Sequence, residues 1–405
     1  MARQDEAGPA EKPNRKPDDS HDRMSDGWID PSLDTNLQTT PREKFGEHLL
    51  NQILTVDLTW ATPILAKYCA TRGRKPHPPI AMLLALIYQR LMLIPSWREL
   101  STHLNTTGLW SRLGFKSPPS HHAFADFTER LGPKGFQELF KALVKVVKKE
   151  ILAHNPFLHF AEDVSIDATL VKAWAQDYKP GQKHRKRKGV KKPRRGATDR
   201  YAKWGFKEQK GKNKIWIFGY KLHAIVESRL EIPLQFTVSS ANRNETRFFK
   251  PQLREPIAEG NKPKFVEADA AYYSNENESF CYSPRRNIVP VIAFRASGRP
   301  KGSKKGKPLG KQPKQNLRKV GKLDDELPFE RNSKQWKRHY NLRWSIERVF
   351  SRAKQEFGLT QLKVRSKNRV TVHFALVFIA MLIVTLVAYQ LNKPGYARRT
   401  SAWRH

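Results

Sequence analysis

The spacing of apolar residues changes near Phe157, and this change constrains the fold more than any other feature of the sequence. Before it, apolar residues recur at helical spacing, whereas after it they fall in short stretches bounded by polar turns. Five of these stretches are rich in β-branched and aromatic residues, which is typical of strands. They are LHFAEDVSIDATLV, IWIFGYKLHAIVES, IPLQFTVSSAN, KPKFVEADAAYY and NIVPVIAF.

Helical segments separate the later strands. NETRFFKPQLREP lies between the third and fourth strands, SNENESFCY follows the fourth, and a longer helix follows the fifth. Consecutive strands fit antiparallel pairing, whereas strand–helix–strand units need parallel crossovers. Over residues 157–392 the sequence therefore predicts an α/β fold, a mixed sheet with helices on both faces. In that order the first and fourth strands could be neighbours.

The residues before this region divide into two parts. Residues 1–42 are polar and contain several prolines, which predicts a disordered tail. Residues 43–152 predict an all-α domain, in which PPIAMLLALIYQRLML places prolines at a helix entry. Ser120 fits an N-cap and Gly132 fits a helix stop. Short helices rich in His, Arg and Ser fit either a helix-turn-helix DNA-binding domain or a plain helical packing domain.

The chain is strongly basic. It carries 75 Lys and Arg against 38 Asp and Glu, a formal net charge of +37, which opposes compaction unless a polyanion binds. Nucleic acid is the commonest such partner, and an anionic membrane is the alternative. The two cysteines, Cys69 and Cys281, lie far apart and indicate neither a disulfide framework nor a thiolate metal site. This usage fits a reducing cytoplasm, and the N-terminus has no apolar core typical of a secretory signal.

Two dense basic runs interrupt the strand and helix pattern. KHRKRKGVKKPRR holds nine Lys and Arg and lies in a predicted basic loop over 181–214, and a second run holds ten in a predicted loop over 299–324. Their glycines and prolines predict mobile loops. A solvated loop or a targeting signal would have the same composition, but in so basic a chain we expect DNA contact. The expected contacts from the first run are Lys183, Arg185, Lys186, Arg187 and Lys188.

The stretch VTVHFALVFIAMLIVTLVAYQ, residues 370–390, is long and apolar enough to span a membrane. A helix buried on all sides has the same composition. Basic residues flank both ends, so the positive-inside rule gives no orientation. Because the stretch follows a helix that completes the fold, we expect it to be buried against the sheet, with no membrane as a partner.

The segment YNLRWSIERVFSRAKQEFGL, residues 340–359, predicts one helix with an unusual polar edge. Tyr340, Arg343, Glu347 and Lys354 fall within about 60° of one another on a helical wheel, beside the apolar face. Glu347 and Lys354 are too far apart for the i,i+4 pair that exposed helices commonly use. A glutamate on this edge could take part in a functional site if other carboxylates lie close to it.

Two aspartates at strand positions could meet Glu347. Asp167 lies in VSIDATL on the first strand and Asp269 in VEADAAYY at the end of the fourth, and sites gather at strand ends in such sheets. Either aspartate could instead be a cap or turn residue. Three carboxylates without His or Cys form an oxygen site that suits Mg²⁺ or Mn²⁺, and the cation would offset their repulsion. Two such ions about 4 Å apart can activate the attacking oxygen and stabilise the leaving oxygen when a phosphodiester bond is displaced.

Together these residues resemble the DDE transposases of bacterial insertion sequences, which have a ribonuclease H-like core. The pattern Y-x2-R-x3-E-x6-K of one branch is present in Tyr340, Arg343, Glu347 and Lys354. IDATLVKAW and DAAYYSNE resemble the segments that carry the family's two aspartates, and the N-terminal helices resemble the domain that precedes the core. ANRNETRF resembles a family connector that often has Asp where Glu245 stands, a departure expected to lie outside the metal site.

The resemblance implies an activity and its residues. Asp167, Asp269 and Glu347 would bind Mg²⁺ or Mn²⁺, two ions in all, for cleavage at transposon ends and transfer of the 3′-hydroxyl into target DNA. Tyr340, Arg343 and Lys354 would hold phosphates, which suits the Arg fork and the Lys point charge. The partner would be double-stranded DNA, bound by a homodimer in the bacterial cytoplasm at the nucleoid.

Two alternatives share this resemblance. A catalytically silent DNA-binding regulator derived from a transposase would be expected to have lost a carboxylate, and none is lost. A metal nuclease that cuts without joining would have the same residues. Asp269 and Glu347 are 78 positions apart (347 minus 269), too few for the large β-insertion domain of some relatives.

Overall fold

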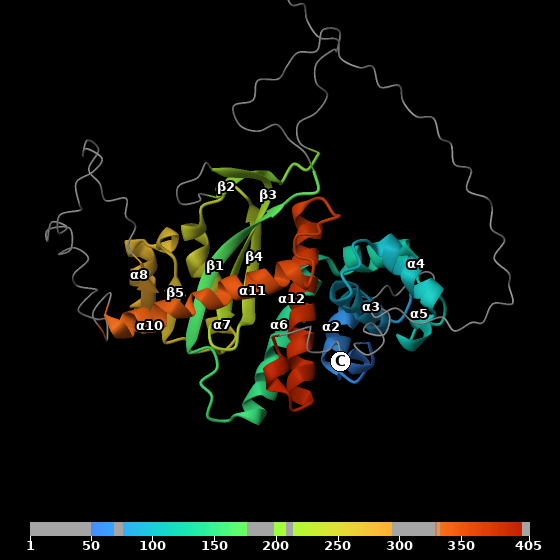
Figure 1. Cartoon of the computed structure of the whole chain (residues 1–405), viewed down its shortest axis with the longest axis horizontal. Helices are drawn as coiled ribbons and strands as arrows, with labels where there is room; N and C mark the ends of the chain where they lie inside the picture. The colour runs from blue at the N-terminus through green and yellow to red at the C-terminus, as the bar shows by residue number, and fades with distance from the viewer. Residues whose placement is uncertain are drawn as a thin grey trace, which may run out of the picture. The chain divides into compact units, whose positions relative to one another are not determined.

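The computed structural model describes residues 50–68, 76–175, 198–207, 214–293, 329 and 333–398 (Figure 1). The predicted tail over 1–42 lies outside these residues. Both basic runs, and with them the five expected DNA contacts between Lys183 and Lys188, lie outside them as well.

Six strands form one mixed sheet in the order β2-β3-β1-β5-β6, with β4 also paired to β3. β3 is antiparallel to β1, β2 and β4, and β5 is parallel to β1 and β6. The mixed sheet is confirmed, and the first and fourth predicted strands, β1 and β5, are neighbours. The strands are β1 (Asp163–Lys172), β2 (Lys203–Lys207), β3 (Ile215–Glu227), β4 (Ile232–Ser240), β5 (Phe265–Ala268) and β6 (Val289–Ile292).

The strand β2 lies inside the segment that was predicted as a basic loop over 181–214, so that prediction is wrong for this part. Its five residues, KWGFK, pair with the start of β3, and Trp204 lies against Phe218 with ring centroids 5.5 Å apart. A Cβ on Gly205 would lie 2.5 Å from the carbonyl oxygen of Ala241, so this strand packs too closely for any other residue. Lysines at both ends of β2 hid the strand signal in the sequence.

Helices cover both faces of the sheet. α10 and α11 contact β1 on one face, where Figure 1 draws them across the sheet. On the other face the ring of His223 in β3 stacks on Phe248, just before α7, with centroids 3.7 Å apart. Successive strand residues point to opposite faces, so Ala224, opposite Asp167, faces α11. These helices are α7 (Phe249–Ala258), α8 (Asn275–Cys281), α10 (Lys334–Leu342), α11 (Trp344–Gln355), η2 (Glu245–Phe248) and η3 (Ala270–Tyr272).

The region before the sheet is helical, as predicted. Pro78 precedes the first residue of α3, Ser120 caps α6 by accepting a hydrogen bond from the Ala123 amide, and Gly132, at φ 56°, kinks α6 just before Pro133. A positive φ suits glycine, which explains why the helix is interrupted there. The elements are η1 (Thr59–Ala61), α2 (Thr62–Lys67), α3 (Pro79–Leu91), α4 (Trp97–Thr107), α5 (Leu109–Arg112) and α6 (His121–His154).

The apolar helix α12 (Lys367–Gln390) is followed by η4 (Pro394–Tyr396) and packs against α3, α6 and β4. It is long and apolar enough to cross a membrane, but its most apolar stretch is buried entirely inside the protein. The predicted burial is therefore confirmed, with α6 and α3 as partners besides the sheet. Phe140 of α6, Phe236 of β4 and Phe378 of α12 meet with ring centroids 5.2 to 6.1 Å apart.

Phe378→Ala should destabilise the helical region and the sheet together, because Phe378 joins α12 to both. Removing a fully buried phenylalanine costs about 3–5 kcal/mol of unfolding free energy. Phe157→Ala is the control, since Phe157 is 91% exposed, and a change within about 0.5 kcal/mol is expected. Urea unfolding followed by circular dichroism measures both. A loss confined to one of two separate transitions would contradict the shared core.

Candidate active site

The parallel pairing of β1 and β5 places Asp167 and Asp269 side by side. The last paired residues of this register are Ile166 and Ala268, so each aspartate is the next residue on its chain. Paired strands lie about 4.8 Å apart. Asp269 also caps η3, where its side chain accepts a hydrogen bond of 2.8 Å from the Ala271 amide.

These two carboxyl groups are poorly solvated. Burial raises the pKa of Asp167 to about 7, and the charge of Asp269 adds to that shift. Burial also raises the pKa of Asp269, with the charge of Glu245 as the next cause, while Arg343 lowers the pKa of both aspartates. A cation beside the pair would favour the ionised forms, so the environment suits metal ligands.

The single helix predicted over 340–359 is wrong, because the structure has two helices, α10 and α11, that meet at Arg343. The side chain of Ser165 in β1 lies 3.2 Å from the carbonyl oxygen of Leu342, an acceptor that a continuous helix would use itself. Ser345, also buried, contacts the same hydroxyl at 3.2 Å. Arg343 keeps right-handed helical dihedrals, so the two helices stay nearly in line (Figure 1).

Glu347 bonds Arg343, and in the described part of the chain its carboxylate does not form a set with Asp167 and Asp269 in which all ligand atoms lie within 4.8 Å of one another. Arg343 Nη1 donates a hydrogen bond of 2.6 Å to Glu347 Oε1, and the Glu347 side chain is 40% exposed. Burial lowers the pKa of Arg343, but the bond to Glu347 and the charges of Glu347 and Asp167 outweigh it and raise that pKa. Arg343 thus interacts with both Glu347 and Asp167. Its Nε has no hydrogen-bond partner among the described residues.

The other two residues of the predicted polar edge lie near the same place. The Tyr340 ring stacks on Trp336 with centroids 4.6 Å apart, and the Arg343 guanidinium lies 5.5 Å from the Tyr340 ring. Burial lowers the pKa of Lys354, the charge of Lys207 lowers it further, and Asp167 opposes the shift. Lys354 is therefore within electrostatic reach of Asp167.

Glu245, which was expected outside the site, lies beside it. Its charge raises the pKa of both Asp167 and Asp269. Lys221 of β3 pairs with Glu245 at 2.8 Å and also donates a hydrogen bond to the Arg243 carbonyl. The expectation failed because the connector after β4 reaches the segment after β5, where the Thr246 hydroxyl donates a hydrogen bond of 2.7 Å to the Ala271 carbonyl. The sequence distance between these segments does not reveal this contact.

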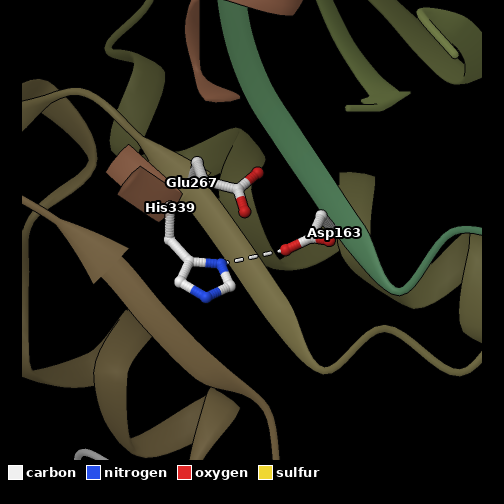
Figure 2. A group of neighbouring side chains, drawn as sticks. All are labelled: Asp163, Glu267 and His339. Carbon is white, nitrogen blue, oxygen red and sulfur yellow. Dashed lines mark hydrogen bonds and ion pairs between the residues drawn. The ribbon is translucent and has the colours of Figure 1, made fainter. Parts of the chain in front are cut away.

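A second group of side chains, which was not predicted from the sequence, lies on the same face. Asp163, Glu267 and His339 are the one set of three or more His, Cys, Asp or Glu in the described part of the chain whose ligand atoms all lie within 4.8 Å of one another (Figure 2). Burial raises the pKa of Glu267 well above its usual value, with Asp163 as the next cause. Asp163 and Asp167 are four residues apart on one strand, and Glu267 and Asp269 are two apart on another, so each pair lies on one face of the sheet. This spacing could have predicted the two carboxylates of the second group.

A cleft of about 840 Å³ lies between the N-terminal helices and the start of α12, and its lining includes none of these acids. Its walls carry Arg98, Lys363, Arg365 and Trp174, and the Arg365 guanidinium lies 4.8 Å from the Trp174 ring. Cations and an indole in one cleft suit a nucleic-acid strand, with contacts to phosphates and to bases.

Two family models match the chain. The transposase DDE domain matches residues 159–383, more than half of the chain, and a transposase domain (DUF772) matches residues 40–130. The protein therefore belongs to the DDE transposase family. No protein in the curated set that was compared matches it.

Family membership and geometry agree at a coarse level. The matched DDE domain covers the mixed sheet and its helices, so the ribonuclease H-like fold class is confirmed. DDE domains use divalent metal ions, and the described residues include clustered acids that could hold one. A transposase acts on DNA, which explains the excess of basic residues.

Proposed function

We propose that this protein is an insertion-sequence transposase that cleaves DNA at transposon ends and joins the freed 3′-hydroxyl to target DNA. The observation that carries this proposal is the pairing of β1 with β5, which puts Asp167 beside Asp269 under the helix that bears Glu347. Cutting and joining are both in-line displacements at phosphorus, so one set of residues can serve both.

The donor set fits divalent metal ions. Asp167, Asp269 and Glu347 offer carboxylate oxygens, the donors that Mg²⁺ and Mn²⁺ prefer. Bound there, one or two ions would polarise the phosphate and help form the attacking oxygen. Ion binding requires Glu347 to turn from Arg343 toward the aspartates, a movement that its partial exposure permits.

Arg343 couples DNA binding to this movement. Without DNA, its guanidinium donates a hydrogen bond to Glu347 and interacts electrostatically with Asp167. A DNA phosphate offers the guanidinium a bidentate partner instead, and that exchange would release Glu347 for the metal. Tyr340, with its ring beside Arg343, and Lys354, within electrostatic reach of Asp167, would hold the neighbouring phosphates.

DNA is held at further places in this proposal. The basic cleft beside Trp174 and Arg365 takes one strand away from the reacting phosphate. The basic run from Lys183 to Lys188 adds contacts from outside the described residues. A homodimer would bind two transposon ends together, in the bacterial cytoplasm at the nucleoid and without a membrane partner.

Glu347→Gln and Lys354→Ala should fail in different ways. Gln keeps the size of Glu347 but removes a metal-binding charge, so cleavage should fall by orders of magnitude while DNA binding survives. Asp167→Asn and Asp269→Asn should behave like it, and their combination should add little. Lys354→Ala should weaken end binding and leave some cleavage at high protein concentration. Cleavage of labelled end DNA and gel shift on the same substrate separate these effects. Near-normal cutting by Glu347→Gln would favour a different catalytic site.

Arg343 should make DNA and metal binding cooperative. With Arg343 drawn to phosphate, Mn²⁺ should bind more tightly to the protein–DNA complex than to the free protein, and Arg343→Gln should remove this difference. Electron paramagnetic resonance titration of Mn²⁺ with and without end DNA measures it. Equal Mn²⁺ affinity in both states of the unsubstituted protein would exclude the coupling.

DNA affinity should depend steeply on salt. Each neutralised phosphate contributes a slope of about −0.9 to log K against log salt. Replacing the nine basic residues between Lys183 and Arg195 by Gln and Ser should make that slope shallower. Fluorescence anisotropy at several salt concentrations gives the slope, and an unchanged value would mean that the run makes no phosphate contact.

A further inference from the structure

Three side chains from distant segments converge at the N-terminal end of β1 (Figure 2). Asp163 begins β1, Glu267 lies in β5 and His339 lies in α10. Asp163 and Glu267 have no exposed surface, whereas the His339 side chain is 21% exposed. Asp163 Oδ1 and His339 Nδ1 are 3.1 Å apart.

Each carboxylate has one oxygen fixed by protein donors, and its second oxygen receives none from the same donors. Arg229 Nε donates a hydrogen bond of 2.7 Å to Asp163 Oδ2, and Arg229 Nη2 forms an ion pair with the same oxygen at 2.5 Å. Asp163 Oδ1 lies against His339. Ser165 and Ser228 lie 3.0 and 2.8 Å from Glu267 Oε2. Glu267 Oε1 is buried and has no hydrogen-bond partner among the residues that the structure describes.

An unpartnered oxygen on a fully buried carboxyl group requires an explanation, because such atoms are rare in folded proteins. The carboxyl group that carries it faces Asp163 and His339 (Figure 2), and one ligand atom from each of the three residues lies within 4.8 Å of the other two. Outer donors such as Arg229 and the two serines are typical of metal centres, where they fix the orientation of the ligands. The missing partner of Glu267 Oε1 is therefore best supplied by a cation.

We propose that Asp163, Glu267 and His339 bind a divalent transition-metal ion, with Zn²⁺ the species that matches them best. One imidazole nitrogen and two carboxylate oxygens are common zinc ligands, at about 2.0–2.2 Å from the metal. Mg²⁺ prefers an all-oxygen octahedron and keeps its water, so this set discriminates against it. Three protein ligands leave a fourth position, which solvent reaches past the partly exposed His339.

This centre is separate from the carboxylates proposed for catalysis. Asp163 and Asp167 lie four residues apart on one strand, a rise of about 13 Å. An ion at Asp163 would join β1, β5 and α10, the helix that carries Tyr340 toward the catalytic carboxylates. The His339 ring already stacks on Phe265 and on Phe329, with centroids 4.0 and 5.3 Å away, so its orientation is set before metal binds.

The test uses the full chain with Asp167→Asn, Asp269→Asn and Glu347→Gln, which removes the proposed catalytic ligands and does not depend on cleavage. Isothermal titration with Zn²⁺ should give one tight site per chain, and a hundredfold excess of Mg²⁺ should not displace the ion. Adding Glu267→Gln or His339→Gln should lower Zn²⁺ affinity by more than about 100-fold, beyond the effect of losing an outer-shell partner. Co²⁺ spectra should report mixed nitrogen and oxygen ligation in the background protein and lose it in both variants.

His154→Gln is the matched control, because His154 also lies near a carboxylate, 3.9 Å from Glu150, but outside the cluster. It should keep the Zn²⁺ site. Unchanged affinity in both cluster variants would overturn the proposal. In the unsubstituted protein Zn²⁺ should raise the thermal midpoint by several degrees more than equal Mg²⁺. No such rise would overturn the proposal even if the variants fail to fold.

Discussion

The parallel pairing of β1 with β5 determines the chemistry of one whole face of the sheet. Alternate residues of a strand share a face, so this register sets Asp163, Ser165 and Asp167 beside Glu267 and Asp269. The helices over that face must therefore cover polar groups. They do so with His339, Arg343 and Ser345. The helices also break at Arg343, where the Ser165 hydroxyl lies against the Leu342 carbonyl.

Burying these groups is unfavourable, and the rest of the fold offsets it. Removing a carboxylate from water costs several kcal/mol unless charges and donors replace the solvent. Asp163 has Arg229 and Glu267 has two serines, but Glu267 Oε1 and Arg343 Nε keep no partner in the described structure. Apolar burial elsewhere supplies the stability, chiefly where α12 packs on α6 and the sheet. Polar strain concentrated on one face, with apolar packing behind it, is the pattern expected of a functional site.

The strands of the sheet were predictable because their apolar runs are long enough to distinguish them from loops, and the order of strands and helices then limited the pairings. β2 escaped because its alternation spans only KWGFK among lysines. The break at Arg343 was not predicted for a different reason: the Ser165 hydroxyl that contacts the Leu342 carbonyl beside it is 177 residues from Leu342 in sequence. His339 and Asp163, which lie in contact, are separated by a similar distance in sequence. Local periodicity predicts an element and its apolar face, but it does not predict which strand residue lies opposite a helix.

Arg343 occupies the junction of these constraints. It lies where α10 meets α11, bonds Glu347 and is within electrostatic reach of Asp167. Its guanidinium is 5.5 Å from the Tyr340 ring and 5.1 Å from the Trp344 ring. In the free protein it supplies positive charge to acids that would otherwise repel one another. A divalent ion would supply more charge at the same acids, so Arg343 and the ion compete for them. Phosphate is the partner that removes the competition, and binding energies coupled in this way are reciprocal. In the proposed function the site would therefore assemble fully only when DNA and metal are both present.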